Sequence, residues 1–186
     1  RNCKEKISAR YPIVESLNAV LWTLSAYFIG LNANAFIYDA LFSALIVMTF
    51  IDIDTKEIPN GIVVFIIILS IPLFFTAKDV VWWHRLVGAV VISVPLYVIA
   101  LVTGGIGGGD IKLYFALGLV LGLYPTLVSA FIAIVSAGLI GGVLLLTKKV
   151  KKGYELPLGP FIALGAVVTV FAGTPIIDGI KNLFGI

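Results

Sequence analysis

The chain has 186 residues, of which 60% are hydrophobic and only 12% are charged, and its mean hydropathy is +1.12. Soluble domains use about 45–50% apolar and 25% charged residues, so this composition excludes an ordinary soluble domain and predicts an integral membrane protein. The formal net charge is +3, and no basic stripe interleaved with aromatic residues lies outside the apolar segments, so we expect no nucleic-acid partner.

The first twelve residues are polar and mostly basic, and they precede a long apolar stretch. We expect residues 1–12 to form a cytosolic segment that is the remnant of a larger loop, and residues 13–186 to form a transmembrane domain. The chain begins with Arg1 and not with Met, which favours a processed chain or a piece of a longer one. Its single cysteine, Cys3, excludes a disulfide within the chain.

Seven apolar segments follow, and most approach the roughly 17–25 residues that cross a bilayer as a helix. We therefore predict an all-α bundle of about seven transmembrane segments, at approximately 13–30, 35–51, 61–77, 86–103, 111–124, 125–147 and 158–177. The fifth is short, and only Tyr124-Pro125 separates it from the sixth, where proline suits a helix start. Small residues let membrane helices approach closely, which we expect in the sixth segment at Gly138, Gly141 and Gly142.

The distribution of Lys and Arg predicts the orientation of the bundle, because cytoplasmic loops of membrane proteins carry an excess of these residues. Ten lie on one side of the predicted membrane: Arg1, Lys4, Lys6, Arg10, Lys56, Lys112, Lys148, Lys149, Lys151 and Lys152. Three lie on the other: Lys78, Arg85 and Lys181. We predict a cytoplasmic N-terminus, with Trp82, Trp83, His84 and Arg85 in an interfacial belt on the outer side.

Two aspartates stand at apolar boundaries on the predicted cytoplasmic side. Asp52 ends the apolar run 46–51 and opens the polar break 52–60, whereas Asp110 ends a glycine run between two apolar stretches. A charged group at a membrane boundary is costly and marks a candidate functional site. Two such carboxylates can act as an aspartic-protease dyad, because neighbouring like charges do not both ionise cheaply and therefore share a proton.

The residues around the two acids allow more than one interpretation. Gly107, Gly108 and Gly109 leave no Cβ beside Asp110, so a substrate backbone could approach closely or add as a strand, although a plain flexible turn also fits. The run matches no phosphate-binding motif, and no strand precedes it. Lys112 either extends to the lipid phosphates or biases one aspartate towards ionisation.

Two further aspartates compete with the chosen pair. Asp54 rivals Asp52, but Asp52 directly follows the apolar run and so lies closer to the helix. Asp39 lies about 20 Å of helical rise from Asp52, which puts it near the opposite membrane face from Asp110. We interpret Asp39 as a boundary residue.

Four sequence elements together resemble the type IV prepilin peptidases, which are membrane aspartic proteases of the GxGD type. They are Tyr11-Pro12-Ile13-Val14-Glu15, Ile51-Asp52 with Pro59-Asn60, Gly107-Gly108-Gly109-Asp110-Ile111-Lys112-Leu113, and Pro157-Leu158-Gly159-Pro160. Their order is that of the family, and they cover nearly the whole chain.

The resemblance implies an endopeptidase of the bacterial inner membrane that removes a short basic leader from prepilins and pseudopilins on the cytoplasmic side. Asp52 and Asp110 match the catalytic pair. The family cuts after a glycine, just before the apolar helix of the substrate. No cofactor is expected for proteolysis.

Bacterial members of the family commonly also methylate the new N-terminus with S-adenosylmethionine. Full-length members carry a further N-terminal helix and a loop with two Cys-x-x-Cys pairs that resembles a zinc site, and Cys3 is the candidate remnant of that loop. We therefore expect methylation and zinc binding only in a full-length protein, and no metal site in this chain.

Charged residues away from the dyad suggest how substrate and lipid bind. Lysines of the segment 148–152 attract anionic lipid headgroups and would repel a basic leader, so we predict that the leader is received near Asp54 and Glu57. The alternative function is a small transporter or channel that uses buried carboxylates to bind a cation or proton. The sequence does not indicate the oligomeric state.

Overall fold

The computed structural model describes residues 8–77, 80–148 and 156–184, and these residues form helices and connections without any strand. The seven helices are α1 (Arg10–Phe28), α2 (Ala33–Thr55), α3 (Asn60–Thr76), α4 (Trp82–Thr103), α5 (Gly108–Leu121), α6 (Leu123–Leu146) and α7 (Gly159–Phe184). The predicted all-α bundle of seven segments is confirmed. Cys3, Lys4, Lys6, Lys78 and the lysines of 149–155 lie outside the described residues.

Four of these helices are long and apolar enough to cross a membrane: α2, α4, α6 and residues 159–179 of α7. Helix α3 is a shorter apolar helix. Helix α5 has only 14 residues, about 21 Å of rise, which is less than the roughly 30 Å of a bilayer core. Helix α1 begins at Arg10, so residues 10–12, expected in the polar segment, belong to its first turn.

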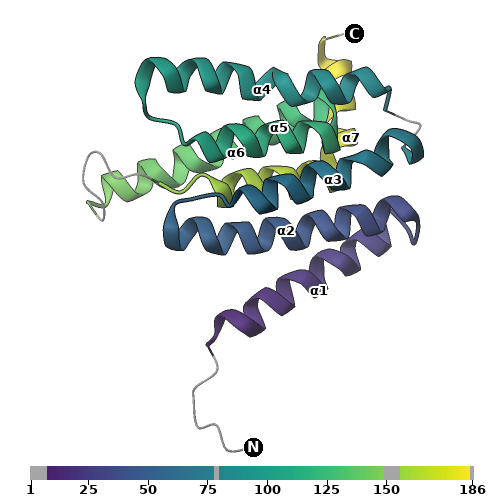
Figure 1. Cartoon of the computed structure of the whole chain (residues 1–186), viewed down its shortest axis with the longest axis horizontal. Helices are drawn as coiled ribbons and strands as arrows, with labels where there is room; N and C mark the ends of the chain where they lie inside the picture. The colour runs from purple at the N-terminus through teal and green to yellow at the C-terminus, as the bar shows by residue number, and fades with distance from the viewer. Residues whose placement is uncertain (1–7, 78–79, 149–155, 185–186) are drawn as a thin grey trace, which may run out of the picture.

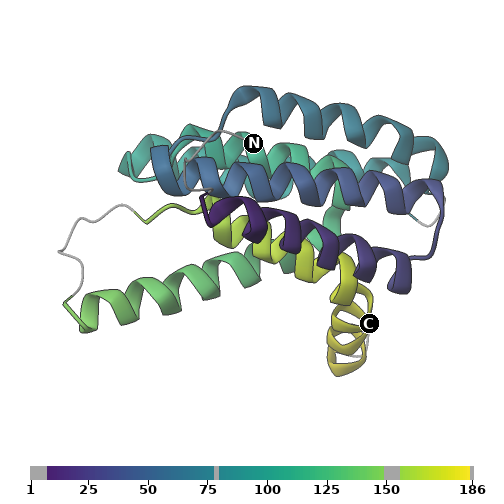
Figure 2. The ribbon, with the colours of Figure 1, turned by 90° about the horizontal axis from the view of Figure 1, so that it is seen from below.

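The helices run alternately up and down the bundle (Figure 1). The start of α1, the α2–α3 and α4–α5 connections, the end of α6 and the start of α7 all lie at one end of the bundle, and Figure 2 agrees. We call this end the polar end, because Asp52 and Asp110 both lie there. The predicted placement of the two aspartates on one face is thereby confirmed, whereas the assignment of that face to the cytoplasm stays a prediction.

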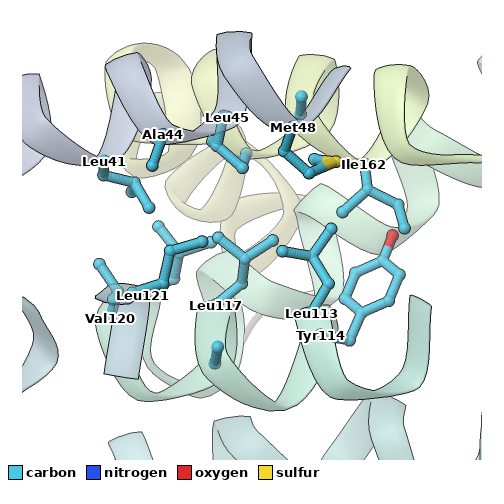
Figure 3. Packing of buried hydrophobic residues seen from close by; sticks show 14 of the residues in the cluster. Leu41, Ala44, Leu45, Met48, Leu113, Tyr114, Leu117, Val120, Leu121 and Ile162 are labelled. Carbon is cyan, nitrogen blue, oxygen red and sulfur yellow. The ribbon is translucent and has the colours of Figure 1, made fainter. Parts of the chain in front are cut away.

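Helix α5 lies in the middle of the bundle, where it packs on α3, α4, α6 and α7. Its apolar side chains Leu113, Leu117 and Val120 are fully buried, and Figure 3 shows them facing Leu41 and Leu45 of α2. In a membrane bundle such side chains stabilise the helix contacts by close van der Waals packing, because lipid is as apolar as the core. The short helix is therefore the centre of the core.

Glycine-to-backbone contacts bring α4 and α5 unusually close together. A Cβ on Gly118 would lie 2.2 Å from the carbonyl oxygen of Gly88, and a Cβ on Gly88 would lie 2.6 Å from the backbone of Gly122. In α6, by contrast, Gly138 and Gly142 face open space, and Gly141 meets only a Leu156 methyl group at 3.7 Å. The prediction that the α6 glycines mediate close packing is wrong.

The turn between α5 and α6 is made by Gly122 and not by Tyr124-Pro125. Gly122 has φ +83°, a left-handed backbone that suits glycine, and α6 begins at the next residue. Pro125 therefore lies within the first turn of α6. Backbone N–H groups have no acceptor within the helix there, so proline costs no hydrogen bond.

Arg85 departs most from its predicted place in an exposed belt. Its side chain is 1% exposed, and Nη1 donates to the carbonyl oxygens of Leu119 and Val120, at 3.1 and 2.5 Å. These carbonyls end α5, where a cation complements both the unpaired oxygens and the helix dipole. Trp82 and Trp83 are exposed as predicted, at 61% and 46%.

Asp39 is also buried, with 7% of its surface exposed, six residues beyond the start of α2 and beside the buried Ser25 of α1. The interpretation of Asp39 as a membrane-boundary residue stays a prediction, but the burial of its side chain against α1 was not expected. Six helical residues rise about 9 Å, so Asp39 lies about 9 Å from the first residue of α2, in the half of the helix remote from Asp52.

We predict that Gly118→Ala lowers the free energy of unfolding by about 3 kcal/mol, because the added methyl group overlaps the backbone of α4. Gly138→Ala is the matched control, since it adds the same group to open space inside a helix and should stabilise by about 0.5–1 kcal/mol. Unfolding of both variants in detergent measures the difference. Equal stability of the two variants would contradict the close α4–α5 contact.

Candidate active site

Asp52 lies in the last turn of α2 and is 4% exposed. Its Oδ2 accepts a hydrogen bond from the backbone N–H of Gly159, 2.8 Å away, at the first residue of α7. A Cβ at Gly159 would lie 2.6 Å from that oxygen and 2.8 Å from the sulfur of Met48. Glycine therefore lets the start of α7 approach closely enough to donate to the carboxylate.

Asp110 lies in the first turn of α5, where a negative side chain is favoured by the helix dipole. Gly107 precedes the helix in an extended conformation, and a Cβ on it would lie 3.1 Å from Oδ2 of Asp110. Gly108 and Gly109 are already helical, so they do not add to a substrate as a strand, contrary to that prediction. A Cβ on Gly109 would meet Ile58 at 2.9 Å, whereas Gly108 faces open space.

Both aspartates line two hollows at the polar end. One, of about 290 Å³, extends over the α2–α3 connection and the start of α5. The other, of about 520 Å³, lies against the α4–α5 connection and residues 156–158 before α7. The two carboxylates are close enough to interact electrostatically, as the dyad prediction requires.

The other predicted binding residues divide into two groups. Glu57 and Lys112 line the smaller hollow together with all three glycines, Gly107, Gly108 and Gly109. Lys112 Nζ donates to Asn60 Oδ1 over 3.0 Å, which places its ammonium group at the rim of this hollow.

Asp54 lies apart from the two hollows and is bound by Arg10 of α1. Arg10 Nη2 donates to Oδ1 over 2.7 Å, and Nη1 donates to Oδ2, so both carboxylate oxygens are engaged. Asp54 and Asp52, two residues apart on α2, thus point to different surroundings, and only Asp52 meets Asp110.

Two residues at this site were missed in the sequence. Gly159 was noted only as part of a motif, although its N–H holds Asp52. Tyr114 lies one helical turn after Asp110, is 4% exposed, and lines a small apolar cavity with that aspartate. Among the described residues its hydroxyl has no hydrogen-bond partner. The helical spacing of four from Asp110 was the available signal.

The described residues contain no group of three His, Cys, Asp or Glu side chains that could bind a metal ion. Cys3, the candidate remnant of a zinc site, lies outside these residues. Zinc binding therefore stays a prediction for a longer protein.

Comparison with known proteins identifies the family. Residues 40–142 match the model of the type IV leader peptidase family, and this span contains both Asp52 and Asp110. A protein of Bacillus subtilis strain 168, named prepilin leader peptidase/N-methyltransferase, is 33% identical over 96% of this chain and 72% of its own length. The chain belongs to the type IV leader peptidase family. The resemblance drawn from the four sequence elements is confirmed.

Other relatives of the chain carry the same printed name as the Bacillus subtilis protein. The protein of Stutzerimonas stutzeri is 31% identical over 94% of this chain and 62% of its own length. That of Neisseria gonorrhoeae is 33% identical over 88% of this chain and 58% of its own length. The chain thus spans about three fifths to three quarters of these relatives. No solved structure matches it significantly.

We predict that Gly159→Ala lowers peptidase activity by about 100-fold, because the added methyl group displaces the Asp52 carboxylate from its place. Gly141→Ala is the control, since it adds a methyl group at an ordinary 3.7 Å contact near the same α6–α7 connection. Steady-state kinetics on folded protein in detergent measure both variants. Full activity of Gly159→Ala would show that the close contact at Asp52 is dispensable.

Proposed function

We propose that this chain is the catalytic part of a membrane aspartic endopeptidase that cleaves the basic leader from type IV prepilins and pseudopilins. The observation that carries the proposal is the convergence of Asp52 and Asp110 on the same hollows at one end of an apolar bundle. The printed names of the relatives, which are prepilin leader peptidases, supply the substrate class.

In the proposed reaction the two carboxyl groups share one proton. The ionised carboxylate removes a proton from a water molecule, which attacks the carbonyl carbon of the scissile peptide bond. The protonated carboxyl group donates to the carbonyl oxygen, and a tetrahedral diol forms. The diol then collapses and the C–N bond breaks as the protonated carboxyl group gives its proton to the leaving amine. The other carboxylate takes a proton from a diol hydroxyl group, so the dyad regains its starting state.

The position of the acids supports hydrolysis over transport. A transporter site is expected near the bilayer midplane, between broken helices. Asp52 and Asp110 instead lie in the last turn of α2 and the first turn of α5, at helix ends where water can reach them. Asp39 is a further buried acid of the bundle, but it lies far along α2 from the pair.

We further propose that the dyad faces the cytoplasm of a bacterium across its inner membrane. Support comes from the split of Lys and Arg that the sequence predicts, with ten on the side of the two acids and three on the other. Lys56 and Lys112 line the hollow itself. Because the relatives are longer than this chain, we propose no step through zinc or S-adenosylmethionine here, and methylation belongs to a full-length protein.

We predict that Asp52→Asn and Asp110→Asn each reduce prepilin cleavage by about 10²–10⁴-fold, because each removes one member of the proton-sharing pair. Asp54→Asn is the control, since it changes an acid on the same helix that is bound by Arg10, and it should keep nearly full activity. Cleavage of a purified prepilin in lipid vesicles measures all three. Full activity of either dyad variant would rule out the mechanism.

We predict that Glu57→Gln lowers kcat/KM for a basic leader by up to about 5-fold, as expected for loss of one exposed charge interaction worth up to ~1 kcal/mol. Asp54→Asn should have a smaller effect, because Arg10 already neutralises that carboxylate. A substrate with an uncharged leader is the control for both. A fall that is equal for the two leaders would contradict a charge interaction with Glu57.

A further inference from the structure

An apolar groove runs into the membrane beside the candidate active site. Its volume is about 560 Å³, within the 300–1,000 Å³ of ordinary ligand sites. Helices α3 and α4, which both pack on α5, form its walls, and α5 forms its floor. The apolar lining consists mainly of Val63, Val64, Ile67, Val94, Ile111 and Phe115.

The groove begins at the polar end and points towards the other end of the bundle. Asn60, at the start of α3, lines its mouth, and Ile67 lies seven residues further along the same helix. Seven residues rise about 10 Å, or two helical turns. Ser93, a polar side chain that lines the groove away from its mouth, already donates to the Ala89 carbonyl oxygen and so does not require a polar ligand.

The mouth of the groove is shared with the smaller hollow around the two acids. Asn60 and Lys112 line both spaces, and their side chains are joined by the 3.0 Å hydrogen bond. A chain that leaves the groove at this mouth therefore enters the hollow that contains Asp52 and Asp110. The order along such a path is apolar wall, polar rim and carboxylate pair.

We propose that this groove binds the first two turns of the substrate's apolar helix, immediately after the scissile bond. This inference rests on the proposed function, in which the cleaved bond separates a basic leader from an apolar helix. The bond must reach the acids at the membrane edge, so the apolar helix that follows must lie within the bilayer next to them. The groove fits such a helix in three ways: its lining is apolar, it extends over about two helical turns, and its mouth opens next to the two acids.

The groove is open to the lipid side, so a helix can enter it laterally. Val64, Val94 and Tyr97 are 53%, 52% and 54% exposed along its walls. A lipid acyl chain is the competing occupant. It would fill the same apolar volume but would bring no peptide bond to the rim formed by Asn60 and Lys112.

Cross-linking tests the occupant directly. A photoreactive benzoylphenylalanine is placed at Val64 or Val94, in the Asp52→Asn background, and a prepilin substrate is added in vesicles of phosphatidylethanolamine and phosphatidylglycerol. We expect at least a 10-fold higher yield of substrate adduct than from the control position Ile99, which is on α4, is exposed, and does not line the groove. Equal yields, or adducts with lipid alone, would overturn the proposal.

Kinetics give a second measurement. Val64→Trp and Val94→Trp fill the groove and should lower kcat/KM for the intact prepilin by about 10-fold or more. A short peptide that ends a few residues after the scissile bond should be cleaved at the unchanged rate, because it has no helix to dock. Ile99→Trp should alter neither rate. An equal loss for prepilin and short peptide would indicate a damaged active site and overturn the groove assignment.

The two proposals fail in different ways. Cleavage of the prepilin by the unaltered chain is measured in the same vesicles. If it does not occur, the proposed function fails. If it occurs but the groove positions behave like Ile99, only the docking groove fails.

Discussion

The structure depends on holding two carboxylates at the edge of an apolar bundle. A buried carboxylate is tolerated only where hydrogen-bond donors or dipoles replace its water. Here helix starts fulfil that role: α7 begins with an N–H that donates to Asp52, and α5 begins with Asp110 in its own first turn. Bringing these two helix starts together places both acids on the same hollows at the polar end.

The second requirement is a short central helix. Helix α5 ends about 21 Å after it begins, so its start reaches the polar end while its last carbonyls remain inside the bundle. Arg85 satisfies those carbonyls, and the contact between Gly88 and Gly118 lets α4 lie directly against the α5 backbone. The place of Asp110 at the start of α5 therefore depends on the contacts that Arg85 and Gly88 make near the other end of the helix.

Much of this arrangement could be predicted from the sequence. The apolar runs predicted the seven helices, although within the described residues only four of them are long and apolar enough to span a membrane. The number of helices between Asp52 and Asp110 predicted that both acids lie at one end. Charge at an apolar boundary then singled out the pair. These signals are strong because a bilayer penalises charges and unpaired backbone groups heavily.

The packing of helix faces could not be predicted in the same way. Lipid is as apolar as the protein core, so no polar stripe distinguishes a lipid-facing side from a buried one. For that reason the sequence predicts close contacts at the glycines of α6, none of which makes one, and no sequence signal marks the close contacts of Gly88 and Gly118. The burial of Asp39, Arg85 and Tyr114 depends on partners from other helices and was missed for the same reason.

The link between α7 and Asp52 has a consequence for which residues can occupy its first two positions. The donor is a backbone N–H, and glycine at position 159 leaves room for it to reach the carboxylate. A larger side chain there would push the carboxylate away, and proline would also remove the donor itself. Pro160 stands one position later, where the helix start has no acceptor for the missing hydrogen. Exchanging these two neighbours would keep the composition of the chain and delete the donor, so the order Gly-Pro itself preserves the carboxylate's anchor.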